Sequence, residues 1–535
     1  MATATRDSAQ QSGERPLTAM RLVSDPGLGL FLAVVGAAIG LLVVLIVVEP
    51  DLSTARFDAL ADAAMGEGLV DALGSLAEVL AAVLGLSLTV VAIVVQLASQ
   101  RYSAKIVDLF MRDPINVGAF GFMVVSCIYV VLLPALAHGS APPRIAIVGG
   151  ILLAVINFGL LLPYFRYVFS FLQPDNIITA IERSAERSLA PITNGERSEA
   201  SVADARETVA TAIERISDNC LAAIGQQDRN LALHSVRTIE RFVCRYHAKK
   251  ARLPPSWAHI DAEAFASLSE GFYDDIVAQG LWVEAKSLLE FEHVLRRSLG
   301  DMNELVSQIA SSTREIGESA LRHDEQEAIA LAIRFFNTYI RHGLNAGNVR
   351  AVYNILDQYR RMASALMRSG PELVDRVVKH LVYYGRTANE RGIPFVTVTV
   401  AHDVRVLCQE AYSAGRDVVP LLDRFLTLDQ KSESTTGDIA LMGVRKAQSI
   451  LGAFFLAAGA ERLAQRIRDD MRVESPERLL RARDEILEID EHKFFEITDR
   501  GFNFEYVEPS RHQFVRAFFQ PFEERALGPN ARVGA

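Results

Sequence analysis

Apolar residues gather in the first third of the chain, in four runs that carry almost no charge. Only the second run contains a charged residue, Glu78. A helix needs about 20 apolar residues to cross the hydrocarbon core of a bilayer, and each run has that length. The pattern therefore predicts four transmembrane helices. They span residues 27–48, 72–97, 117–136 and 145–165.

The first run is interpreted as a retained span and not as a cleaved signal peptide. It exceeds the ~7–15 apolar residues of a signal peptide, and acidic Glu49-Pro50-Asp51 follows it in place of a small-residue cleavage site. Gly36 and Gly40 within it form a GxxxG spacing. This spacing lets helices pack closely, either within one chain or between copies.

Lysine and arginine are unevenly divided among the short connections. The N-terminal tail and the connection after the second run hold three each, whereas the other two connections hold one each. Because positive residues are retained on the cytoplasmic side, both termini are predicted to be cytoplasmic. Arg101, Lys105 and Arg112 follow the second run, where they are expected to contact anionic headgroups or to face the cytoplasmic domain.

The second run carries a narrow stripe of small and polar side chains. At ~100° per residue these positions lie within about 40° of one line along a helix, and the other faces carry Leu, Val and Ile. The stripe consists of Glu78, Ala82, Gly85, Thr89, Ala92 and Gln96. Two interpretations are open: close helix packing, or a water-lined path in which Glu78 of several subunits forms an acidic ring.

The same part of the chain resembles a bacterial family of predicted membrane proteins of unknown function. The resemblance is carried by residues 96–103, Gln-Leu-Ala-Ser-Gln-Arg-Tyr-Ser, by Phe110-Met-Arg-Asp113, and by Gln173-Pro-Asp-Asn176. It covers roughly residues 25–180 and departs at Ala104 and again over 221–228. The resemblance implies a four-span region in the bacterial inner membrane with a cytoplasmic C-terminal domain, and it implies no established activity.

Helical periodicity dominates from residue 173 onward. Gly347, Gly370, Gly392 and Gly415 recur every 22–23 residues and separate amphipathic runs. This spacing predicts helices of about 18 residues in two-helix units of about 45, as in HEAT-like solenoids. A non-repetitive helical bundle is the alternative.

Three segments of this half carry expectations of their own. Residues 394–400 alternate β-branched side chains, which is typical of a strand, although the glycine spacing requires a helix there. Residues 245–252 are expected to form a basic surface loop. The aromatic-rich C-terminal tail is expected to dock on its own domain or on a neighbouring subunit.

The sequence thus predicts an all-α protein in four parts. These are an N-terminal tail (1–26), a four-span transmembrane domain (27–172), a cytoplasmic helical domain (173–490) and an aromatic-rich tail (491–535).

Charge and motifs exclude several functions. Half of the residues are hydrophobic, which excludes a disordered chain, and residues 173–535 hold 46 basic and 53 acidic residues, which does not favour nucleic acid. The four cysteines lie far apart, and no phosphate-binding, dinucleotide, hydrolase or kinase motif occurs. The nearest metal-like group, His323-Asp324-Glu325 with Glu491-His492 and Glu496, is more typical of solvated helix faces. No catalytic residue, cofactor or metal is predicted.

Two hypotheses of function remain. One is a homo-oligomeric ion-permeation or gating protein in which the second span lines the path. The other is a non-catalytic scaffold in which the lipid-embedded spans present the helical domain to a cytoplasmic protein partner.

Overall fold

The computed structural model describes residues 69–101, 110–111, 113–137, 144–171, 173–265, 268–429, 437–494 and 499–527. The chain divides into two compact units, Met1–Ile177 and Ile178–Ala535. The predicted first span, with Gly36 and Gly40, lies outside the described residues, as do Lys105 and Arg112.

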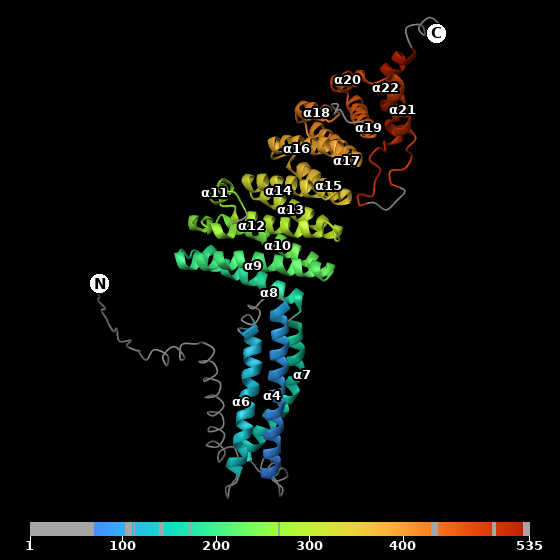
Figure 1. Ribbon diagram of the computed structural model, residues 1–535. Coiled ribbons are helices and arrows are strands. Elements are labelled where there is room, and N and C mark those ends of the chain that lie inside the picture. The colour runs from blue at the N-terminus through green and yellow to red at the C-terminus, as the bar shows by residue number, and fades with distance from the viewer. Residues whose placement is uncertain are drawn as a thin grey trace, which may run out of the picture. The chain divides into compact units, whose positions relative to one another are not determined.

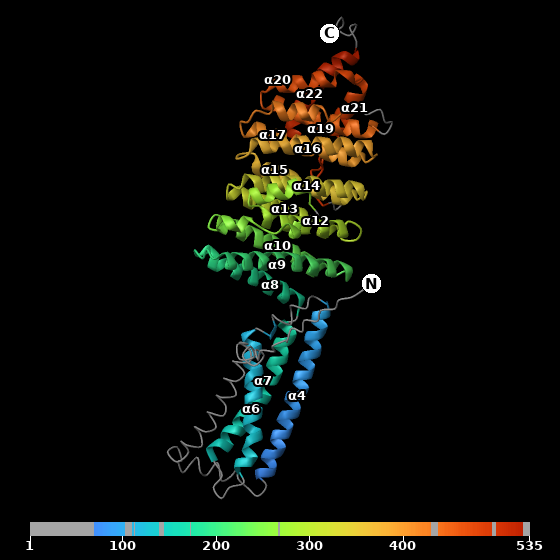
Figure 2. The same cartoon turned by 60° about the vertical axis from the view of Figure 1, so that its left-hand side comes forward.

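The N-terminal unit contains three long apolar helices that run side by side in both views (Figures 1 and 2). They are α4 (Leu69–Arg101), α6 (Pro114–Ala137) and α7 (Arg144–Phe171). The stretches Asp71–Gln96, Pro114–Ala135 and Ile145–Ser170 are long and apolar enough to cross a membrane. Three of the four predicted spans are therefore found as apolar helices.

The core of this unit lies where α4 and α7 each pack against α6. Leu73 and Leu80 of α4 are buried there together with Tyr129 and Leu133 of α6. Gly150 of α7 permits the closest approach, because a Cβ built at Gly150 would lie 2.1 Å from Leu133 Cδ1. The glycine therefore sets how closely α6 and α7 pack.

The C-terminal unit is mainly helical, and no β-strand forms in its described part; Lys493 and Phe502 make one isolated antiparallel bridge. The α-helices are α8 (Pro174–Thr193), α9 (Glu199–Gly225), α10 (Arg229–Lys250), α11 (Glu270–Ala278), α12 (Trp282–Ser298), α13 (Asn303–Arg322), α14 (Gln326–Asn345), α15 (Val349–Leu366), α16 (Pro371–Glu390), α17 (Pro394–Ser413), α18 (Val419–Leu426), α19 (Gly437–Ala457), α20 (Glu461–Asp470), α21 (Pro476–Leu487) and α22 (His512–Leu527).

These helices pack in a repeat-like stack. Through the middle of the unit each helix contacts the next helix and the next but one, so that α13, α15, α17 and α19 form one layer and α12, α14, α16 and α18 the other (Figures 1 and 2). Three of the four recurring glycines lie just after helices. Gly347, Gly392 and Gly415 adopt φ angles of 64°, 73° and 70° at the ends of α14, α16 and α17, a conformation that glycine adopts without strain.

The β-branched segment 394–400 is helical and begins α17. Pro394 occupies the first turn, where its missing N–H costs nothing. Val396 and Val400 are buried, and the hydroxyl of Thr397 donates to the carbonyl of Gly385 at 2.9 Å. Tertiary packing therefore overrides the local strand preference, as the glycine spacing required.

The stretch 245–252 is mostly the end of α10, so the prediction of a loop is wrong for most of its length. Arg245 pairs with Glu182 and Glu186 of α8. The ammonium group of Lys250 lies 2.7 Å from the buried carboxylate of Glu284. Burial alone would raise the pKa of Glu284, but Lys250 and His247 hold it below its ordinary value. Arg245 and Lys250 therefore form ion pairs within the C-terminal unit.

The segment after α21 packs back on the stack. Arg500 is 2% exposed, and its guanidinium binds the carboxylate of Asp403 on α17. It also lies over the ring of Tyr353 on α15, 4.3 Å from the centroid. Phe518 and Phe519 of α22 are fully buried. The aromatic residues described here dock within their own chain.

Candidate functional site

The polar stripe of α4 is exposed along its whole length. Glu78, Ala82, Gly85, Thr89, Ala92 and Gln96 are all accessible in the chain. The hydroxyl of Thr89 donates to the carbonyl of Gly85 at 2.9 Å, so its hydrogen-bonding need is partly met within the helix. A Cβ built at Gly85 would meet no atom within 4 Å.

The opposite face of α4 makes the packing contacts. Its buried residues are Leu73, Ala77, Leu80, Ser87, Val91 and Val95. At ~100° per residue these positions lie about 100–180° around the helix from Glu78. The stripe therefore does not pack against α6 or α7, which excludes those two helices as the explanation for its small residues.

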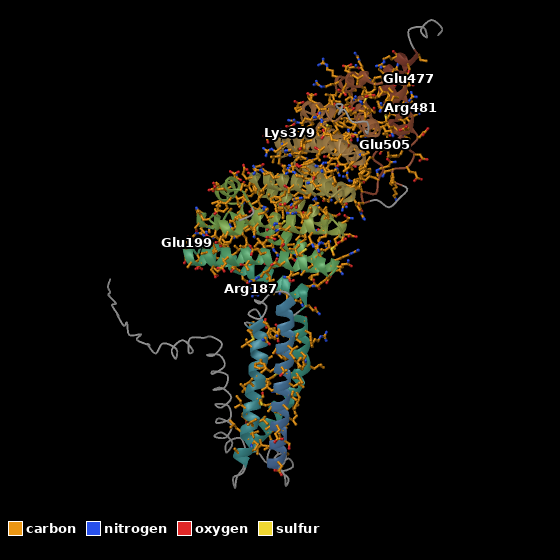
Figure 3. The ribbon with its side chains drawn as sticks, viewed as in Figure 1. Arg187, Glu199, Lys379, Glu477, Arg481 and Glu505 are labelled. Carbon is orange, nitrogen blue, oxygen red and sulfur yellow. The ribbon has the colours of Figure 1, made fainter. Side chains whose placement is uncertain are left out.

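The stripe is bordered by apolar side chains that also face outward. Val79, Leu86 and Ile93 lie on one side of it and are 50%, 66% and 51% exposed. Figure 3 shows that the side chains drawn on α4, α6 and α7 are mostly carbon, whereas charged groups cover the C-terminal unit. The one carboxylate of the stripe, Glu78, thus lies on an exposed surface that is otherwise suited to lipid or to another helix.

The proposed headgroup residues are described only in part. Arg101 is the last residue of α4, and its side chain lies outside the described residues. Lys105 and Arg112 lie outside them entirely, so the predicted headgroup contact stays a prediction.

A polar cluster that sequence reasoning missed joins the start of α6 to the end of α7. Asp113 accepts the backbone N–H groups of Ile115 and Asn116 at 3.1 and 3.0 Å, and the hydroxyl of Tyr167 donates to the same carboxylate at 2.6 Å. The hydroxyl of Tyr164 donates to Asn116 Oδ1 at 2.7 Å. Asp113 ends one of the resemblance motifs, and its position just before Pro114 was the available sign of a helix cap.

Asn157 makes the interhelical hydrogen bond that its position in the fourth span predicts. Its amide donates to the carbonyl of Met123 at 3.3 Å. Asn157 therefore contributes to the packing of α7 on α6.

The residues of the metal-like group named in the sequence analysis contact other parts of the chain. His323 Nδ1 donates to the backbone carbonyl of Ser319, and Glu325 pairs with Lys250, while His492 stacks on Phe502. Among the described residues, no group of three or more His, Cys, Asp or Glu side chains is placed to hold a metal ion.

Residues 28–231 match the model of a family described as "Predicted membrane protein (DUF2254)". The match includes both segments at which the chain departs from the family pattern. Together with the three apolar helices it indicates a membrane protein. No curated protein matches the chain.

One solved structure is similar, a "Circular tandem repeat protein with novel repeat topology and enhanced subunit contact surfaces". It shares 15% identity, with 94% of this chain and 100% of that chain covered and a TM-score of 0.26. A similarity this low carries no conclusion about function.

Proposed function

We propose that this chain is the subunit of a homo-oligomeric ion-permeation or gating protein of the bacterial inner membrane, with both termini cytoplasmic and α4 lining the path. The observation that supports this proposal is the outward position of the stripe, opposite the packed face of α4. A carboxylate, a threonine and a glutamine facing only acyl chains would be costly. Association of several copies through α4 would instead place these groups around water.

The polarity of the stripe suggests a cation path. Glu78 is its single charged residue, and a ring of such carboxylates attracts cations. Gly85, Ala82 and Ala92 would keep the path open because they have small side chains or none. In this proposal the protein has no catalytic activity and needs no cofactor.

Single-channel recording in planar bilayers tests the proposal. Purified protein should give discrete openings, and Glu78→Gln should lower cation selectivity while Thr89→Val should change unitary conductance. Thr338→Val on α14 is the control, because the hydroxyl of Thr338 donates to the carbonyl four residues earlier, as that of Thr89 does. Silence under voltage, tension and pH steps, from protein shown to be folded, would refute the permeation hypothesis.

Cysteine crosslinking tests the assembly separately. In a Cys127→Ala background, Ala92→Cys should form disulfide-linked dimers between copies in the membrane. Leu152→Cys, exposed on α7, should link more slowly. Equal rates at the two positions would mean that α4 does not mediate assembly.

The scaffold hypothesis remains the alternative because the two-layer helical stack forms most of the chain and presents many charged side chains. It predicts a protein bound to the C-terminal unit and no effect of the stripe substitutions beyond stability. Silent bilayers together with a partner retained by the full-length protein, and lost on truncation of α9–α22, would favour it.

A further inference from the structure

Arg405 of α17 is a half-buried cation that forms no salt bridge among the described residues. Its Nε is shielded from solvent and has no hydrogen-bond partner among the described residues. Its Nη2 donates to the carbonyl of Phe504 at 3.3 Å. Burial lowers the pKa of Arg405 to about 10, so the guanidinium stays protonated at neutral pH.

The carboxylate of Asp403, on the same helix as Arg405, already has partners. Asp403, two residues before Arg405, binds Arg500 through both oxygens at 2.6 and 3.2 Å. Arg360 lies 3.3 Å from the same carboxylate. Among the described residues Arg405 forms no salt bridge, and a charge left unpaired in the interior is costly. The charge of Arg405 is therefore not neutralised by a salt bridge within the described part of the chain.

A cavity of about 220 Å³ opens beside this arginine. Arg405 and Gln409 of α17 form one wall, Ile450 and Phe454 of α19 form another, and the segment that follows α21 covers it with Tyr506 and Arg511. Glu508 is the single carboxylate in the lining, and it makes no salt bridge within the described part of the chain. The lining thus combines two guanidinium groups with one apolar surface.

We propose that this cavity binds a small organic anion, a carboxylate or phosphate monoester attached to an apolar group. A guanidinium donates two parallel N–H groups to such an anion, and Arg405 has the unsatisfied donor. The amide of Gln409 and the hydroxyl of Tyr506 supply further donors. Ile450 and Phe454 would contact the apolar group, and an apolar wall with few polar groups is typical of small-molecule sites.

The ligand would also stabilise the docking of the segment after α21 on the helical stack. Tyr506 and Arg511 come from that segment, whereas Arg405 and Phe454 belong to the stack. A molecule that binds only when these parts are together stabilises the docked arrangement by mass action. This inference does not depend on the permeation hypothesis.

Isothermal titration calorimetry of the full-length protein in detergent tests the proposal with four probes: benzoate, phenyl phosphate, inorganic phosphate and uncharged benzamide. Benzoate or phenyl phosphate should bind one molecule per chain, and benzamide and inorganic phosphate should bind at least about tenfold more weakly. Arg405→Met should weaken binding of the organic anion roughly 10- to 100-fold, the loss expected for a charge-assisted hydrogen bond. Arg516→Met, on the exposed face of α22, is the control and should bind as the parent does.

Three results would overturn the proposal: no binding of either organic anion at about 10 mM, equal binding of benzamide, or unchanged binding by Arg405→Met. Arg511→Gln gives a second test, because Arg511 is exposed and its loss should not impair folding. The affinity of Arg511→Gln for the organic anion should also fall. The melting temperature of Arg405→Met without ligand distinguishes a binding role from a structural role. Removing a half-buried cation that forms no salt bridge should not lower this melting temperature. A lower melting temperature of Arg405→Met with unchanged affinity would assign Arg405 to stability alone.

Discussion

The strongest perturbation of the C-terminal unit is predicted at Arg500. Its guanidinium binds Asp403, donates to the carbonyl of Tyr353 at 2.8 Å, and lies over the rings of Tyr353 and Phe504 at 4.3 and 5.3 Å. Arg500→Met keeps an apolar side chain of similar length and removes the charge. The variant therefore leaves the buried carboxylate of Asp403 with only Arg360, at 3.3 Å, to offset it.

Removing one partner of a buried ion pair costs about 3–5 kcal/mol because the other charge stays buried. The retained contact with Arg360 favours the lower end of that range. Arg350→Met is the matched control: Arg350 binds Asp499, one residue away from Arg500, but its side chain is 58% exposed. An exposed pair contributes about 0–1 kcal/mol.

Hydrogen exchange of the full-length protein in detergent, resolved by mass spectrometry, measures the effect. The backbone N–H of Asn503 donates to the carbonyl of His492 at 2.9 Å, so exchange across residues 499–507 reports opening of this segment. About 3 kcal/mol corresponds to exchange faster by roughly 100-fold, and Arg350→Met should change it by less than about fivefold. Equal exchange in the two variants would show that the buried pair does not hold the segment.

Three further predictions concern single contacts. Gly452→Ala should lower the free energy of unfolding by about 1–3 kcal/mol, because a Cβ there would lie 2.1 Å from Phe518 Cε2; thermal unfolding should show little change for Gly225→Ala, where a Cβ meets nothing within 4 Å. Burial raises the pKa of Asp429 to about 6, above the ~3.9 of an unfolded chain. Because the folded state binds this proton more tightly, the free energy of unfolding should fall as pH rises from about 4 to about 6. The fall should be shallower in Asp429→Asn, and identical slopes in the two proteins would contradict this prediction. Asp113→Ala and Tyr167→Phe should each destabilise the N-terminal unit by about 1–3 kcal/mol and, in a double-mutant cycle, by less together than the sum of the two.

Much of the fold follows from periodicity. Apolar runs of spanning length appear as α4, α6 and α7, and the recurring glycines end helices of the C-terminal stack. Residues 394–400 show that the spacing of helix ends outweighs local β-propensity, since the buried valines of this segment stabilise α17 by packing. These features were predictable because each depends on residues close together in sequence.

The direction in which each helix face points was not predictable. The stripe on α4 is visible in the sequence, but packing and exposure give the same pattern of small and polar residues. The burial of Leu80 and Val91 on the opposite face shows that the stripe does not pack on α6 or α7. In the same way, Asp403 and Arg500 each look like ordinary surface residues, and 97 positions separate them.

That separation also sets an order in time. The helices of the stack contact near neighbours and can form as they leave the ribosome, whereas Asp403 becomes buried before its main partner exists. At ~5–20 residues per second, the 97 residues that separate it from Arg500 delay the pairing by roughly 5–20 s. During synthesis the carboxylate of Asp403 therefore has Arg360 but not yet Arg500 as a partner, and the ring of Tyr353 is not yet covered by Arg500. A segment translated 97 residues after Asp403 completes the middle of the stack, so nascent chains that stop before Arg500 would be the ones most exposed to chaperones and proteases.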